Sequence, residues 1–551
     1  MIDGGQAESA GAGRGDAAPD RAAAERLPGR RARVGWMLRV NRLFHPDAGW
    51  SRLGVFARAF RGGCSPRPAA TSTVSRWETG DLAVPTTTLR RYEELLELPP
   101  SLLDTTARTL LRYLAPGAVR IIGPPRADTP SAEDGPPIED LLDAATGSTV
   151  LTGRDWETLT DLLAAAGPGA VMPGRVWREI SARLVREMVI ADGTAWLLRF
   201  EALNTLLNHP RGAGAAIGAC IDFAGDESGA GVLEVVCALD NTASPEASIF
   251  LAGQFREPLH ARVRSGALLA SLRKIGYGHY TSEQLRTIAR SAAETAGSVS
   301  ERQYDRSLAI ELIKALPPAL TAAAGRDVTR QLREAELQQA QRNTPRTAYT
   351  ELLALRVLGS LEREIPGYED KLLVPLISEM LHSPSPDARL YVSCLLNATP
   401  FAAPVAALIA QDLSAPAALR DPGRALPMLD ALRFLGGQRQ RALIERLVLT
   451  PGLPAPVVAT ALHHLAHVGR DSSPAFWSAA VAHLIGDGRR AQAELRADPL
   501  AVHDLVYALG RADQDEYLAA IRADPRIAAP ARAAARWWLT LPEHIRKSSA
   551  L

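Results

Sequence analysis

The sequence has few cysteines and no long apolar run, and both shortages exclude whole classes of protein. Its 551 residues include four cysteines, at Cys64, Cys220, Cys237 and Cys394. None of them forms a CxxC pair, so neither a zinc site nor a disulfide framework is indicated. The N-terminus lacks the apolar segment of a signal peptide, and no stretch approaches the roughly 20 apolar residues of a membrane span. We therefore expect a cytoplasmic protein with no membrane partner.

Motifs that carry catalytic chemistry are also missing. There is no GxSxG motif and no phosphate-loop lysine, and the acidic residues form no defensible catalytic pair. HHLAH at 463–467 places His463 and His467 one helical turn apart, but His464 occupies the position where a zinc protease needs glutamate. Without a third ligand, an ordinary helix surface is the favoured interpretation of this segment. We expect no metal, no cofactor and no enzyme activity.

Lysine is absent from residues 30–92, although this segment contains twelve arginines. Only Asp47, Glu78 and Asp81 oppose them, which leaves a formal charge of +9. The whole chain carries +1, so the remainder is mildly acidic. A basic module on an acidic body is the charge layout expected of a nucleic-acid-binding protein. On charge alone, an arginine-rich surface without that function stays an alternative.

The N-terminal part of the chain divides into a tail and a helical domain. Residues 1–29 have few large apolar side chains, which predicts a disordered tail. In residues 30–114, apolar residues recur at helical spacing in five short segments. Ser51, Thr71 or Ser72, and Ser101 are the expected N-caps of the second, third and fifth helices, and Gly80 is the expected end of the third.

The third of these helices contains the stretch TSTVSRWETG, at residues 71–80. This stretch, followed by a proline and a leucine-rich fourth helix, resembles the helix-turn-helix of the Cro and phage-repressor (XRE) family. In that family a pattern of the form S/T-x-I/V-S-x-W/I-E-x-G closes the recognition helix. The resemblance covers about residues 31–98, and six or seven positions agree in type and spacing.

The resemblance implies a role for each matching residue. Val74 and Trp77 correspond to core positions, and Glu78 corresponds to a structural position at the helix end. The residues expected to contact bases and phosphates are Ser72, Thr73, Ser75 and Arg76. Short hydroxyl side chains fit against groove edges and phosphates, and arginine can form two hydrogen bonds with guanine or phosphate.

The chain departs from the family pattern in two ways. Arg52 stands where the family usually has a glutamine near the start of helix two. The link at residues 61–70 is several residues longer than the usual tight turn. This link could tilt the recognition helix, or it could bring Arg61 and Arg67 to phosphate. We include Arg52 and Arg67 among the expected DNA-binding residues.

The remaining sequence predicts a linker and a long helical body. Residues 115–149 are rich in proline and glycine, and we expect a semi-stiff connector there. Residues 150–551 contain helical segments of 10 to 16 residues, several of them starting at a proline. Starts at Pro386, Pro422, Pro454, Pro499 and Pro530 are spaced as in a two-helix repeat. The segments loosely resemble HEAT or armadillo repeats, with TPR-like stacking as the runner-up.

We therefore expect an all-α protein, in which a helix-turn-helix domain precedes an α-solenoid of antiparallel helix pairs. The favoured function is that of a transcriptional regulator that binds double-stranded DNA at the nucleoid and holds a protein, peptide or small ligand on its solenoid. Regulators of this resemblance commonly bind two-fold sites as homodimers. The alternative is a solenoid adaptor whose basic module is a docking arm.

Overall fold

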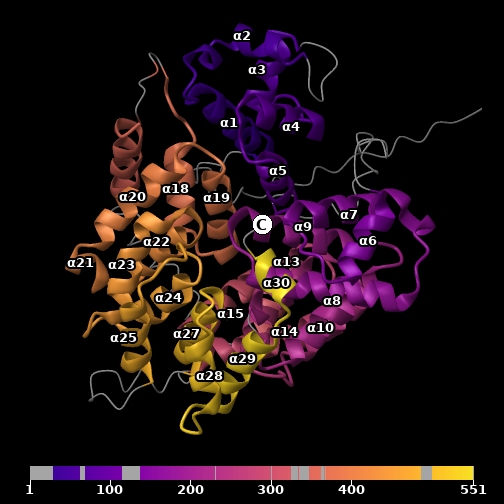
Figure 1. Cartoon of the computed structure of the whole chain (residues 1–551), viewed down its shortest axis with the longest axis vertical. Helices are drawn as coiled ribbons and strands as arrows, with labels where there is room; N and C mark the ends of the chain where they lie inside the picture. Colours follow the sequence, from indigo (N-terminus) through magenta and orange to yellow (C-terminus); the bar gives the residue numbers. More distant parts are fainter. Residues whose placement is uncertain are drawn as a thin grey trace, which may run out of the picture.

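The computed structural model describes residues 29–61, 69–113, 137–229, 231–298, 301–323, 330, 333, 347–361, 365, 368–485 and 499–549. Every regular element in these residues is an α-helix or a short 3-10 helix, and none is a strand. The predicted all-α fold class is therefore confirmed. A small N-terminal lobe occupies one end of the molecule, above a larger body (Figure 1). The predicted tail at residues 1–29 lies, apart from Gly29, outside the described residues.

The small lobe, which we call the head, comprises residues 30–113. Its elements are α1 (Arg30–Leu43), the 3-10 helix η1 (Ala48–Ser51), α2 (Leu53–Ala59), α3 (Thr71–Thr79), α4 (Thr86–Leu95) and α5 (Leu102–Tyr113). All five predicted helices are present. Residues 62–68, in the link between α2 and α3, lie outside the described residues.

The helix ends of the head agree only in part with the prediction. Ser51 lies within η1, and neither α2 nor α3 has a side-chain cap at its start, so the predicted caps at Ser51 and at Thr71 or Ser72 are wrong. Their apolar faces are buried in the head, and that packing stabilises these short helices without a local cap. Gly80 ends α3 in the left-handed conformation, with φ of 80°, as predicted.

The start of α5 is capped from a distance. The predicted cap Ser101 instead donates its hydroxyl to Glu157 in the body, at 2.8 Å. The Glu93 carboxylate, at the end of α4, accepts hydrogen bonds from the amides of Ser101, Leu103 and Asp104 at 2.7–3.1 Å. A single carboxylate therefore satisfies three amides at this helix start, which a serine hydroxyl could not do.

The body consists of two groups of helices, which we call the first stack and the second stack. In the first stack α7 contacts α9, α8 contacts α10, α11 contacts α13, and α13 contacts α15. The elements of the first stack are α6 (Ile138–Thr146), α7 (Gly153–Ala166), η2 (Gly167–Gly169), α8 (Gly174–Ile190), α9 (Gly193–Leu207), α10 (Ala213–Gly225), α11 (Val232–Ala238), η3 (Leu239–Asn241), α12 (Pro245–Gly253), α13 (Ala261–Gly276), α14 (Ser282–Gly297), α15 (Gln303–Ala315) and α16 (Pro318–Ala323).

The second stack includes a helix at residues 347–359. It continues with α18 (Leu373–His382), α19 (Pro386–Asn397), α20 (Ala402–Leu413), α21 (Pro416–Leu419), α22 (Pro422–Leu435), α23 (Gln438–Leu449), α24 (Ala455–Leu465), α25 (Pro474–Leu484), α27 (Pro499–Arg511), α28 (Asp515–Ala523), α29 (Ala529–Thr540) and α30 (Glu543–Ser548). The predicted starts at Pro386 and Pro422 are confirmed. Helices α19, α22, α24, α27 and α29 form a row in which each contacts the next.

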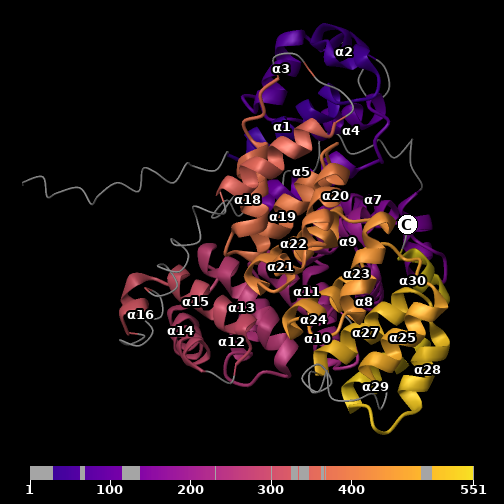
Figure 2. The same ribbon diagram turned by 90° about the vertical axis from the view of Figure 1, so that its left-hand side faces the viewer.

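The two stacks pack against each other, as Figure 2 shows from a second direction. At the end of the chain α30 contacts α8. The Tyr507 hydroxyl donates to the Val189 carbonyl at 2.8 Å, and Arg199 donates to the Ser548 carbonyl at 2.9 Å. The helix pairing agrees with a repeat architecture, but the chain turns back on itself, and the HEAT-like solenoid stays a prediction.

The predicted linker at residues 115–149 is wrong over its last part. Residues 138–146 form helix α6, which buries Leu141 and Ala145. Arg183 of α8 donates hydrogen bonds to the carbonyls of Ala144, Ala145 and Gly147 at the end of this helix, at 2.7–3.3 Å. The proline-rich composition of the whole segment concealed its short amphipathic end. Residues 114–136 lie outside the described residues.

Candidate nucleic-acid interface

Helix α3 has one buried face and one face directed to solvent. Val74 is fully buried and Trp77 is 9% exposed, so the predicted core positions are confirmed. Ser72 and Arg76 are exposed, whereas Thr73 and Ser75 are partly exposed. The four side chains expected to contact DNA therefore lie on the part of the helix that the head leaves open.

The C-terminal end of α3 is held by a buried ion pair. Arg42 of α1 donates to both carboxylate oxygens of Glu78, each at 2.7 Å. The same guanidinium donates to the carbonyls of Trp50 and Ser51 at 2.9 Å. Tyr92 of α4 also donates its hydroxyl to Glu78, at 3.0 Å. Burial, together with the neighbouring Glu78 carboxylate, raises the pKa of Tyr92 well above its ordinary value. Glu78 is therefore a structural residue, as expected.

Aromatic packing orients α2 against α3. The Phe60 ring, at the end of α2, lies 5.6 Å from the Trp77 ring of α3 and 5.4 Å from the Tyr92 ring. Phe56 lies 4.9 Å from Tyr92. Edge and tilted aromatic contacts of this kind add about 0.5–1.5 kcal/mol each to the burial of the rings. These large side chains therefore hold α2 and α3 in their relative position.

Two glycines allow α1 to approach the end of α3. A Cβ atom on Gly35 would lie 2.6 Å from the Trp77 carbonyl oxygen, and one on Gly80 would lie 2.7 Å from the Ala32 nitrogen. Any other residue at either position would force the two helices apart. The approach also brings the backbone of Arg31, whose side chain is exposed, next to the end of α3. Arg31 is one of the twelve arginines of the basic segment, but no short-range pattern in the sequence relates it to α3.

The predicted basic side chains near α3 differ in how they are placed. Arg52 precedes α2 and is exposed, and Arg58 and Arg61 are exposed on or just after the same helix. Within the described residues, none of these guanidinium groups, nor that of Arg76, forms an ion pair. Arg67 lies outside the described residues. Figures 1 and 2 show α2 and α3 at the end of the head that is remote from the body, where a long polymer could reach them.

Other arginines counted in the charge of +9 have structural partners. Arg33 is buried and pairs with Glu379 of α18 at 2.7 Å, and Arg42 pairs with Glu78. Arg91 donates to the Ala59 carbonyl at the end of α2 at 2.8 Å and pairs with Glu94. The charge available to a partner is therefore smaller than the count from the sequence, and it includes the exposed arginines on and beside α2 and α3.

The histidines of HHLAH do not form the helix surface that the sequence favours. His464 is buried and lies 3.1 Å from Asp430, and His467 lies 2.6 Å from Asp192 of the first stack. Burial lowers the pKa of His464 to about 4 and lowers that of His467 well below its ordinary value. The segment faces another part of the chain, which a single-helix pattern cannot reveal. Among the described residues, no group of three or more His, Cys, Asp or Glu side chains could hold a metal ion.

The geometry thus defines an all-α protein with an exposed helix at the tip of a basic head. A scan against protein-family models finds no match, and searches of the curated proteins and of the solved structures find none either. None of the described helices combines the length and apolarity that crossing a bilayer requires.

Proposed function

We propose that the chain is a DNA-binding transcriptional regulator, in which α3 of the head reads double-stranded DNA and the helical body senses a protein, peptide or small ligand. The observation that carries this proposal is the outer face of α3. It presents Ser72, Thr73, Ser75 and Arg76 to solvent, while Val74 and Trp77 hold the helix in the head.

The surroundings of α3 support the same function. Arginines without ion-pair partners in the described residues lie beside it at positions 52, 58 and 61. Phosphate contacts from arginine supply much of the affinity for DNA, and contacts to base edges supply specificity. The Arg42–Glu78 pair fixes the helix before DNA arrives, so little ordering is left to occur on binding.

We also propose an oligomeric state for the protein when it is bound to DNA. Two-fold DNA sites match two-fold proteins, so we propose a homodimer at the nucleoid. We propose no enzymatic activity, no cofactor and no metal for this chain.

The first experiment measures binding of the full-length protein to sheared DNA from its own genome at two salt concentrations, followed by sequencing of the retained DNA. Enrichment of a few loci that persists at the higher salt supports sequence-specific regulation. Uniform retention that disappears with salt would show that the arginines bind phosphate alone.

Substitutions in α3 test the interface itself. On an enriched site, Ser75→Ala and Arg76→Ala should each weaken binding by about 1–3 kcal/mol, because each removes one contact to a base or phosphate. Arg290→Ala removes an exposed arginine of α14 in the first stack and serves as the charge-matched control. Equal affinities for the three variants and the unchanged protein would reject the assignment of α3.

The adaptor alternative is favoured by one observation, the ten-residue link at positions 61–70, which is longer than a tight helix-turn-helix turn. In an adaptor the body would be the working surface and the head would dock on a protein. The double variant Ser75→Ala/Arg76→Ala separates the two proposals in vivo. Full activity of that variant would favour the adaptor, whereas loss of regulation would favour DNA reading.

A further inference from the structure

The head is attached to the second stack through α1. Arg33 forms its buried ion pair with Glu379 of α18. The indole nitrogen of Trp36 donates to Asp370 at 2.9 Å, and its ring stacks on Phe401 with centroids 5.7 Å apart. These contacts are buried or partly buried, so α1 moves with the second stack rather than independently of it.

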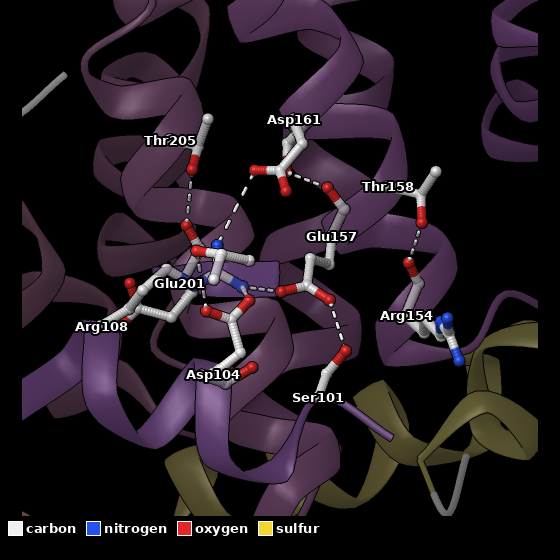
Figure 3. Close-up of polar contacts among 12 residues, drawn as sticks. Ser101, Asp104, Arg108, Arg154, Glu157, Thr158, Asp161, Glu201 and Thr205 are labelled. Atoms are coloured by element: carbon white, nitrogen blue, oxygen red, sulfur yellow. Dashed lines mark hydrogen bonds and ion pairs between the residues drawn. The ribbon is translucent and has the colours of Figure 1, made fainter. Parts of the chain in front are cut away.

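The head is attached to the first stack through α5. Figure 3 shows Arg108 of α5 among the carboxylates of Glu157 and Asp161, both on α7. The ion pair with Asp161 measures 3.7 Å, and Arg108 also pairs with Glu157. The next residue, Thr109, donates to Glu201 of α9 at 2.5 Å, and Arg112, one turn further along α5, pairs with the same carboxylate.

One cluster joins the head to both stacks at once. Arg273 of α13, in the first stack, pairs with Asp387 of α19 at 3.1 Å and donates to the Tyr391 hydroxyl at 2.9 Å. It also pairs with Asp240 of its own stack, at 2.6 Å. The Tyr391 ring lies 4.3 Å from the ring of Tyr113, the last residue of α5. Accordingly, α5 contacts both α9 and α19, and in Figure 1 it descends from the head between the two halves of the body.

The contact between the stacks continues away from the head as a row of polar pairs. Glu234 of α11 pairs with Arg433 of α22, and Arg262 of α13 lies 2.7 Å from His503 of α27. Asp192, before α9, pairs with Arg511 of α27. We call this row, together with the Arg273 cluster, the seam. Charged side chains between the two stacks must stay paired when the stacks move, since an unpaired buried charge is strongly unfavourable. A packed interface of this kind changes between discrete arrangements rather than deforming continuously.

We propose that the two stacks jointly position the head, so that repacking along the seam changes the packing of α1, α3 and α5 and thereby the affinity of α3 for DNA. The DNA step rests on the proposed function, whereas the positional coupling does not. A shift of one stack relative to the other displaces the contacts of α5 with the first stack from the contacts of α1 with the second stack. The head must absorb this shift between these helices, and α1 is the helix that holds the end of α3 through Gly35 and Arg42.

The test removes one ion pair of the seam that lies far from the head along the chain. Two substitutions with opposite effects on the net charge are used. Glu234→Gln and Arg433→Gln each remove the ion pair between α11 and α22, but they change the net charge in opposite directions. Glu445→Gln is the matched control, because Glu445 has nearly the same exposure, 22% against 17%, and pairs with Arg441 inside the second stack. All proteins are full-length.

The first readout is amide hydrogen exchange without DNA, measured by mass spectrometry. In both seam variants the amides of α1, α3 and α5 should exchange about three- to tenfold faster, the range expected when a coupled contact is lost. The control should leave them unchanged. Unchanged exchange in the head of both seam variants would overturn the coupling. If one of the two variants does not fold, exchange in the other variant tests the coupling.

The second readout is affinity for an enriched DNA site. Coupling predicts that both seam variants change the dissociation constant in the same direction, by about three- to tenfold. Opposite changes would mean that long-range charge alone acts, and would overturn the proposal. If the unchanged protein binds no DNA while head exchange still responds to the seam, the proposed function fails and the coupling stands.

Discussion

The arginines of the body and those at the tip of the head differ in burial and in pairing. In the first stack, Arg183 and Arg199 are buried, and both pair with Glu187, a carboxylate with no exposed surface. At the tip of the head, Arg58 and Arg76 are exposed, and within the described residues neither has an acidic partner. The number of arginines therefore does not distinguish structure from function. What distinguishes the two groups of arginines is whether an acid or a helix-end carbonyl lies within hydrogen-bond distance. A guanidinium without such a partner stays available to phosphate.

Removing the acid on the buried side should have the largest effect on stability. Glu187→Ala leaves Arg183 and Arg199 without their shared carboxylate and deprives the Trp156 indole of its acceptor at 2.8 Å. Breaking a buried pair by deleting one partner typically costs about 3–5 kcal/mol. We expect a loss of this size in the free energy of unfolding, measured by urea titration.

Glu179→Ala is the control for this measurement, since Glu179 is an exposed glutamate on the same helix. Exposed substitutions of this kind usually change stability by less than about 0.5 kcal/mol. Similar losses for the two variants would mean that the buried cluster does not stabilise the body as described.

The buried histidines of the second stack predict a pH dependence. Burial lowers the pKa of His464 and of His503 to about 4 each, against an ordinary value of 6.5. His464 faces Asp430, His463 and Arg433, and the groups around His503 are Arg262, Asp504, His463 and His260. Because the unfolded chain binds protons first, stability is complete above pH 6.5 and falls as the pH drops from 6.5 toward 4.

The expected loss between pH 7.5 and 5.5 is about 1 kcal/mol for each of the two histidines. Thermal unfolding at a series of pH values measures it. His503→Gln should reduce this loss of stability by about 1 kcal/mol, because it removes one of the histidines that bind a proton only in the unfolded chain over this pH range. A loss that is the same in this variant would show that other groups cause the acid sensitivity.

Short-range patterns in the sequence predicted the head better than the body. The alternation of Val74 and Trp77 with polar residues reports which face of one helix is buried, and Gly80 reports a local backbone conformation. Both signals depend on residues within one or two turns, so the sequence contains them directly. They were sufficient to place α3 and its outer face.

Contacts between residues far apart in the sequence could not be predicted from such short-range patterns. His467 meets Asp192, and Ser101 meets Glu157, across separations that no periodicity encodes. The amphipathic turn of α6 was concealed by the prolines that precede it. The seam was missed for the same physical reason: each of its charges resembles an ordinary surface residue on its own helix, and only the packing of the two stacks buries it.

Two arginines of the head allow a direct comparison between an exposed guanidinium and a paired one. Loss of Arg58 should hardly change stability, whereas loss of Arg91 should lower it moderately. Arg58→Ala removes an exposed guanidinium and should change the free energy of unfolding by less than about 0.5 kcal/mol. Arg91→Ala removes the side chain that donates to the Ala59 carbonyl at the end of α2, and should lower the free energy of unfolding by about 1–3 kcal/mol.

The effects of the two substitutions on DNA binding should have the reverse order. If Arg58 contacts a phosphate, its removal lowers the slope of log K against log salt by about 0.9, whereas removal of Arg91 leaves that slope nearly unchanged, since its guanidinium is already engaged with the head. Equal slopes for the two variants would show that burial and pairing do not determine which arginines of the head meet DNA.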